Sequence, residues 1–234
     1  MRKVALSIAA FFLLTSLVVA AQLTNVSEPT NVKAGGTLIV ELDSGDVEIT
    51  TGANQIQVDV IGIEQTQVQN LSIEESGQTV RVTYRPDRNL GRGNARFQID
   101  VPVSVNVDVR TAGGDIAISG DQLVGTVSCK TAGGDILLPK MVDGEVTVKT
   151  AGGDIIGGVV KGSSEVTTAG GDIKFSSSEG KAVLRTSGGD IEVGDVGYDL
   201  DVVTAGGDIF LGNVGGSGCD KTSGGDIHVG DVAG

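Results

Sequence analysis

Seven aspartates recur at one position of a repeated phrase, and they are the residues of this chain best placed to do chemistry. Each stands between a Gly-Gly pair and an Ile in the phrase Thr-Ala/Ser-Gly-Gly-Asp-Ile. They are Asp115, Asp135, Asp154, Asp172, Asp190, Asp208 and Asp226. If the repeats stack, the carboxylates form one outward-facing row. Such a row can accept hydrogen bonds from the backbone, bind a hard cation such as Ca²⁺, or supply an acid and a base.

The residue pattern favours the structural role for this row. An Asp beside a Gly-Gly corner can accept hydrogen bonds from the turn backbone, with glycine supplying a positive φ. Calcium between the coils is the alternative, although the nine-residue spacing and the additional glycine of the known calcium solenoid pattern are absent. The seven aspartates therefore stay the metal candidates, and we expect no other cofactor and no catalytic residue.

The spacing of the phrase predicts a repeat architecture. It begins at Thr111, Thr131, Thr150, Thr168, Thr186, Thr204 and Thr222, at intervals of 20, 19 and then 18 residues. A fixed period near 18 is typical of a solenoid, in which each unit stacks on the next. Apolar residues alternate with polar ones on both sides of the phrase, as in Ile191 and Val193. Alternation with period two indicates half-buried strands.

These features predict an all-β, single-stranded parallel β-solenoid (a β-helix) with about 18 residues per coil. Each coil has two clear strands and a shorter third side, and the coils stack in sequence order about 4.8 Å apart. Right-handed winding is the default for parallel crossovers. Left-handed hexapeptide helices are the alternative, but their six-residue repeat is missing here. The threonines of the phrase continue the inward alternation, so their hydroxyls are expected to bond the backbone at the corner.

Residues 22–110 differ from the repeats and are expected to form an N-terminal β-strand region and cap. Glycine is sparse here, and three of the four prolines lie in this part of the chain. Residues 43–49 are interpreted as a degenerate first repeat. The alternation runs without a break from Phe97 to Val109, which predicts that residues 22–110 form one continuous domain with the repeats of residues 111–234.

The first 21 residues are typical of a signal peptide. Arg2 and Lys3 precede an apolar run that ends in Val19-Ala20-Ala21, small residues suited to signal peptidase. An uncleaved membrane anchor is the alternative, because this run could just span a thin bilayer. We expect cleavage, no membrane span afterwards, and export to the periplasm, the cell surface or the medium.

Composition excludes several classes of function. The chain carries 17 basic and 30 acidic residues, a net charge of −13, which argues against nucleic acid as a partner. One His and two Cys make structural zinc and most His-based catalysis improbable. Cys129 fits an inward core position, whereas Cys219 falls where the apolar pattern has decayed. Because they lie five coils apart, no disulfide between them is expected. His228 should point outward.

The order of these features resembles the bacterial putative-adhesin family, a domain of unknown function found in envelope proteins. The resemblance covers about residues 36–234 and rests on Ser44–Ile49, on the Phe97–Pro102 strand and on the serial Gly-Gly-Asp-Ile phrases. It implies a single-stranded β-solenoid. It carries over no catalytic residues, since the family has none agreed.

Three functional hypotheses follow. The first is a non-catalytic, exported, adhesin-like envelope or cell-surface scaffold that binds an envelope protein or a glycan. A calcium-binding surface solenoid is the alternative. A polysaccharide-degrading β-helix enzyme is a second alternative, weakened because the coils are minimal and nearly identical, without the long loops of a cleavage site. Open strand edges at the C-terminal end predict end-to-end self-association, and the decayed apolar pattern of the penultimate coil predicts that it is weak.

Overall fold

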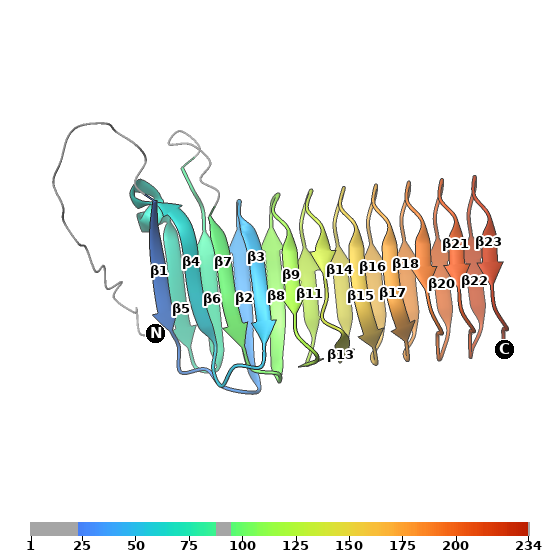
Figure 1. Ribbon diagram of the computed structural model, residues 1–234, viewed down its shortest axis with the longest axis horizontal. Helices are drawn as coiled ribbons and strands as arrows, with labels where there is room; N and C mark the ends of the chain where they lie inside the picture. The colour runs from blue at the N-terminus through green and yellow to red at the C-terminus, as the bar shows by residue number, and fades with distance from the viewer. Residues whose placement is uncertain (1–22, 88–94, 234) are drawn as a thin grey trace.

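The computed structural model describes residues 23–87 and 95–233. The expected signal peptide lies outside these residues. The described chain is all-β apart from one short 3-10 helix, η1 (Gln65–Asn70). None of its helices has the length and apolar character needed to cross a membrane. Figure 1 shows the strands lying side by side along the long axis of the molecule, with β1 near one end and β23 near the other.

The described residues form two long sheets. The 10-stranded sheet, called sheet A, has the order β22-β20-β18-β16-β14-β11-β8-β2-β6-β5. Its strands are β2 (Gly36–Leu42), β5 (Leu71–Ser76), β6 (Thr79–Tyr84), β8 (Val105–Thr111), β11 (Val127–Lys130), β14 (Val146–Lys149), β16 (Ser164–Thr167), β18 (Ala182–Arg185), β20 (Leu200–Val203) and β22 (Gly218–Lys221).

The other sheet, called sheet B, is 13-stranded within the described residues and has the main order β1-β4-β7-β3-β9-β12-β15-β17-β19-β21-β23. Its strands are β1 (Leu23–Pro29), β3 (Asp46–Thr51), β4 (Gln57–Glu64), β7 (Arg96–Val101), β9 (Ile116–Ser119), β10 (Leu123–Val124), β12 (Ile136–Leu137), β13 (Met141–Asp143), β15 (Ile155–Val160), β17 (Ile173–Ser178), β19 (Ile191–Val193), β21 (Ile209–Leu211) and β23 (Ile227–Val229).

From β8 onward the chain alternates between the two sheets and stacks in sequence order. Every neighbouring pair in this part is parallel and keeps the same register, so that Ile173 pairs with Ile191 and Ile191 with Ile209. Single bridges join Ser178, Val196, Val214 and Val232 into a third side. The period-2 alternation therefore predicts both the strands and their inward faces correctly.

The N-terminal region departs from sequence order, which corrects the expectation of sequential stacking. β2 pairs with β6 on one side and with β8 on the other, although residues 43–104 separate β2 from β8 in the chain. In the same way β3 lies between β7 and β9. The first coil is thus inserted between two later ones, as Figure 1 shows for β2 and β3. Antiparallel pairs, β1 with β4 and β5 with β6, occupy the outer end.

The run from Phe97 to Val109 is also broken, contrary to the sequence prediction. β7 ends at Val101 in sheet B, and β8 starts at Val105 in sheet A. Pro102 stands between them, and a residue without an amide proton suits a corner better than the middle of a sheet. The alternation is interrupted at this corner, where Pro102 is buried and Val103 is exposed, and it resumes with Val105 facing the interior.

The core is a set of apolar ladders enclosed by the two sheets and the third side. Ile116, Ile155, Ile173, Ile191 and Ile209 are all at most 1% exposed. Size differences between coils are compensated locally. A Cβ added at Gly157 would lie 2.3 Å from the Phe175 ring in the next coil, so the glycine makes room for that ring. In the N-terminal region the Tyr84 and Phe97 rings pack with their centroids 5.6 Å apart.

Candidate functional site

The repeated phrase forms a corner where consecutive coils are joined by side chains as well as by the backbone. Each threonine hydroxyl donates to the carbonyl oxygen of a glycine in the preceding coil, as Thr186 Oγ1 does to Gly171 at 2.9 Å. The threonine side chain is buried at six of the seven positions. The expectation that these hydroxyls bond the backbone at the corner is confirmed, and a buried bond of this kind stabilises the stack.

The seven aspartates come together in one row, as predicted, and each engages the next coil. In every pair from Asp115 to Asp226 the Oδ1 atom accepts a hydrogen bond from the backbone N–H of the following aspartate. These N–O distances lie between 2.7 and 2.9 Å. Asp46, in the degenerate first repeat, does the same toward Asp115 at 3.1 Å. One carboxylate oxygen of each accepting residue therefore has a structural role.

The glycines of the phrase are required for a different reason from the predicted one. None of the glycines in the seven full phrases is among the positive-φ glycines of the described residues, although Gly45 in the degenerate first repeat has a φ of 119°. Instead, the second glycine lies directly against the coil before it. A Cβ at Gly189 would be 2.1 Å from the Gly171 carbonyl oxygen, closer than any real contact. The spacing of the coils at this corner thus depends on the missing side chain.

Substitutions at Asp190 separate the hydrogen-bonding role from a role of charge. We expect Asp190→Asn to change the free energy of unfolding by less than about 0.5 kcal/mol, because an amide oxygen can accept the same bond. Asn213 already does so for the N–H of Asp231 in a parallel row. Asp190→Ala removes the acceptor for Asp208 and should cost about 1 kcal/mol.

Chemical denaturation of the two variants, with and without a calcium chelator, measures this difference. Equal losses for Asn and Ala, together with a chelator effect on the wild-type protein alone, would contradict the structural role and favour calcium.

Within residues 23–87 and 95–233, no three His, Cys, Asp or Glu side chains are grouped so that they could hold a metal ion.

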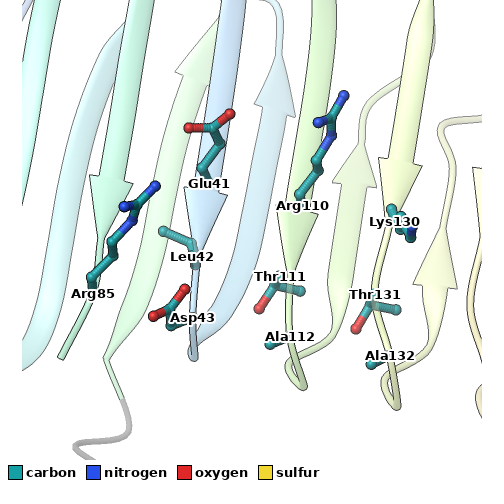
Figure 2. Close-up of a pocket in the computed structure, with 10 residues that line it drawn as sticks. All are labelled: Glu41, Leu42, Asp43, Arg85, Arg110, Thr111, Ala112, Lys130, Thr131 and Ala132. Atoms are coloured by element: carbon teal, nitrogen blue, oxygen red, sulfur yellow. The ribbon is translucent and has the colours of Figure 1, made fainter. Parts of the chain in front are cut away.

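A shallow groove of about 370 Å³ lies on the outer side of sheet A, at the carboxyl-terminal ends of β6, β2, β8 and β11. Three basic side chains line it, Arg85, Arg110 and Lys130, together with Glu41 and Asp43. Figure 2 shows these side chains in a row across neighbouring strands. Because β2 is inserted between β6 and β8, residues distant in the sequence meet here.

The basic side chains that line the groove differ in whether they form ion pairs. Glu41 pairs with Arg81 at 3.1 Å, and Arg110 pairs with Asp108 at 3.1 Å. Arg85 and Lys130 form no ion pair with any described residue. The groove therefore contains two cations that form no ion pair with a described residue, beside the Asp43 carboxylate, in a protein whose net charge is −13.

Sequence reasoning missed these basic residues, although a signal was present. The residue before the threonine is basic in five of the seven phrases, namely Arg110, Lys130, Lys149, Arg185 and Lys221. The register places them at one outward position of sheet A. Arg110, Lys130 and Lys149 lie on adjacent strands and make an unbroken row of positive charge.

A second groove, of about 390 Å³, lies over the outer face of sheet B near β21 and β23. Phe210 and His228 are register partners, and their rings stack with centroids 5.1 Å apart and 11° between planes. His228 is exposed, as expected from the sequence. Phe210 is 42% exposed, and the sequence analysis did not foresee that the two rings meet.

The two cysteines are free and differ in environment. Cys129 is 1% exposed in the interior, and Cys219 is exposed on β22. Burial, with a smaller contribution from the charge of Asp108, raises the pKa of Cys129 to about 12. Since the thiolate is the reactive form, the Cys129 thiol is protected by its protonation state as well as by the core.

We expect one thiol per native chain to react with a disulfide reagent at pH 8, and two after denaturation. The reacting residue is Cys219, so Cys219→Ser should abolish labelling of the folded protein. Spectrophotometric thiol counting checks this. Rapid labelling of Cys129 in the native state, or a Cys129–Cys219 disulfide in a non-reducing peptide map, would contradict the stacked arrangement.

The fold and its faces define a class, the all-β proteins that stack short parallel strands into a solenoid-like rod. Among solved structures, a putative adhesin from Bacteroides fragilis is similar in fold, with a TM-score of 0.60 and 16% identity; the match covers 89% of this chain and 98% of that one. A putative adhesin from Parabacteroides merdae matches with a TM-score of 0.44 and 12% identity, over 90% of this chain and 96% of that one.

The family follows from the sequence profile. The chain belongs to the Toastrack DUF4097 family, which matches residues 36–230. This agrees with the resemblance to a putative-adhesin family drawn from the repeated phrases. A comparison with curated proteins gave no match.

Proposed function

We propose that the protein is a non-catalytic, adhesin-like scaffold that is exported and acts in the envelope or at the cell surface. Family membership and the fold shared with a protein named a putative adhesin support this proposal. The short connections between the strands from β8 to β23 add support, because they leave no long loop in that part of the described chain to build a cleavage site. Its partner is an envelope protein or a glycan.

The observation that carries the proposal is the register of the outer faces. Side chains that point outward from neighbouring strands repeat at the strand spacing of about 4.8 Å. An outer face can therefore carry one chemical group on several neighbouring strands, as the basic residues do on β8, β11 and β14. A surface of this kind suits a partner that is itself extended and repetitive.

The finer features of the architecture belong to the same proposal. We infer a right-handed solenoid, since parallel crossovers wind in that sense by default. Corner residues bonded between successive later coils are 18 apart, which supports about 18 residues per coil. Residues 22–110 serve as the cap. Weak end-to-end self-association belongs to the same proposal.

The proposal is tested with the mature protein immobilised and exposed to fractionated envelope material from a bacterium that encodes it. We expect retention of a glycan or protein component, and no release of reducing sugar from acidic polysaccharides on prolonged incubation. Release of reducing ends that scales with protein concentration would overturn the non-catalytic assignment. Failure to retain any envelope component would overturn the binding role.

A further inference from the structure

We propose that the groove across β6, β2, β8 and β11 binds a linear polysaccharide that carries carboxylate groups, with Arg85, Arg110 and Lys130 as its contacts. The inference rests on the proposed binding function and names the class of partner. It begins from the groove in Figure 2, which neither the family match nor the similar structures assign to any ligand.

The state of pairing of the cations is the first argument. Eight ion pairs occur in the described residues, and they occupy most of the basic side chains. Arg85 and Lys130 are both exposed and unpaired, and both line the same groove. Two of the five basic side chains that form no ion pair among the described residues thus meet in one concave place, which favours an anion there.

The arrangement of the charges is the second argument. Arg110 and Lys130 are register partners on adjacent strands, and Lys149 follows on β14. Arg85 lies three strands from Lys130, a backbone separation of about 14 Å at normal strand spacing. Arg85 follows Tyr84, the register partner of Leu42, so it lies two residues along the strands from the row of Arg110 and Lys130. The three cations therefore span an oblique, extended path across the strands, which fits a polymer better than a compact anion. Arginine also binds carboxylates in a planar, bidentate manner.

The acidic surroundings decide which polyanion fits. Nucleic acid presents a charge every 1.7 Å or so along its axis, and it would be repelled by a protein of net charge −13. Glu41 and Asp43 stand within the groove and further disfavour a densely charged ligand. A polysaccharide with at most one carboxylate per sugar can place its charges on the cations and its hydroxyl groups beside Glu41 and Asp43, which accept hydrogen bonds.

The test uses polygalacturonate oligomers and the same oligomers after methyl esterification, which removes the charge and keeps the sugar. Calorimetric titration of the mature protein should show binding of the acid form that weakens with salt, and no measurable binding of the ester. Equal binding of the ester would overturn the proposal, because the carboxylate would then be irrelevant.

Matched charge variants locate the site. Arg85→Gln with Lys130→Gln should weaken polygalacturonate binding about tenfold or more. The control, Lys33→Gln with Lys181→Gln, removes the same charge from two exposed cations that also form no ion pair with a described residue but lie near the opposite ends of the sheet A strands. It should change binding less than about twofold. Equal effects of the two double variants would show that binding depends only on the net charge of the protein, and would overturn the proposed groove site.

Asp43→Asn is expected to change polygalacturonate binding in the opposite direction. Removing this exposed carboxylate from the groove should strengthen binding by about two- to fivefold, since a nearby like charge is lost. Weaker binding of Asp43→Asn than of the wild type would contradict the placement of the anion.

Two further outcomes separate this inference from the proposed function. If the Arg85 and Lys130 double variant retains envelope material as well as the wild type, the groove is wrong and the binding role stands. If no variant retains any material, the binding role itself fails. Groove-dependent binding to phosphatidylglycerol vesicles without binding to polygalacturonate would replace the polysaccharide by a lipid surface.

Discussion

Gly189→Ala is expected to lower the free energy of unfolding by about 3 kcal/mol or more. The new Cβ would stand 2.1 Å from the Gly171 carbonyl oxygen, and the obstacle is backbone that is itself held in the stack. Overpacking of this kind typically costs 1–3 kcal/mol or more, because neither partner can rotate away. Urea denaturation followed by circular dichroism measures the loss.

The neighbouring residue is the control. A Cβ at Gly188 would lie 3.4 Å from the nearest atom, the Gly170 carbonyl oxygen, which is an ordinary contact. We expect Gly188→Ala to be neutral or to stabilise by up to about 1 kcal/mol, since alanine lowers the entropy of the unfolded chain. Equal losses at Gly188 and Gly189 would show that the close approach of the coils is not the cause.

Ile191→Ala is expected to cost about 2–5 kcal/mol. The side chain is 0% exposed and lies between Ile173 and Ile209 in the central ladder of sheet B. Its truncation leaves a cavity that neighbouring coils cannot close without breaking their register, so the upper half of this range is expected. Thermal and urea unfolding both report the loss.

Glu192 supplies the matched control one residue away. It points outward and pairs with Lys174 at 3.6 Å on the exposed face. Exposed ion pairs contribute little, so Glu192→Ala should cost less than about 0.5 kcal/mol. If the two substitutions prove equally harmful, the assignment of inward and outward positions is wrong along the whole ladder.

The repeats could be predicted from the sequence because one local rule governs them. The alternation of apolar and polar residues around each phrase predicts which side chains point inward, and the fixed period predicts which residues are neighbours in adjacent coils. Thr186 and Asp190 therefore have the partners that the pattern indicates, in the coil before and the coil after. The fold was predictable in the repeats, because the same contacts recur there from coil to coil.

The insertion of β2 between β6 and β8 could not be predicted in this way. β2 and β8 pair over a long stretch of intervening chain, and the degenerate phrase at residues 43–49 marks β2 as part of a coil without stating which coils lie beside it. Several strands alternate as well as β6 and β8 do, so the pattern does not state that these two are the neighbours of β2. Tertiary packing decides the order, and single-sequence periodicity carries no information about it.

The groove was missed for the same reason. Arg110 and Lys130 belong to a basic position that can be read beside the repeated phrase, but Arg85 and Asp43 join them only through the order of β6 and β2. The sequence analysis explained the glycines of the phrase by a positive φ, which is a property of one residue. The structure explains them by close approach to the preceding coil, which depends on tertiary packing. The sequence thus predicted the rows of equivalent residues along the repeats, but not the groove that forms where β2 is inserted beside them.

The account depends most directly on β2 lying between β6 and β8, because that order brings the groove residues together. Engineered cysteine pairs in a Cys219→Ser background test it. Ile39 and Asp108 are register partners, so Ile39→Cys with Asp108→Cys should form a disulfide on mild oxidation. Arg81→Cys with Asp108→Cys should not, since two strand spacings of about 4.8 Å exceed disulfide reach. Cross-linking of the Arg81 pair and not of the Ile39 pair would contradict the account.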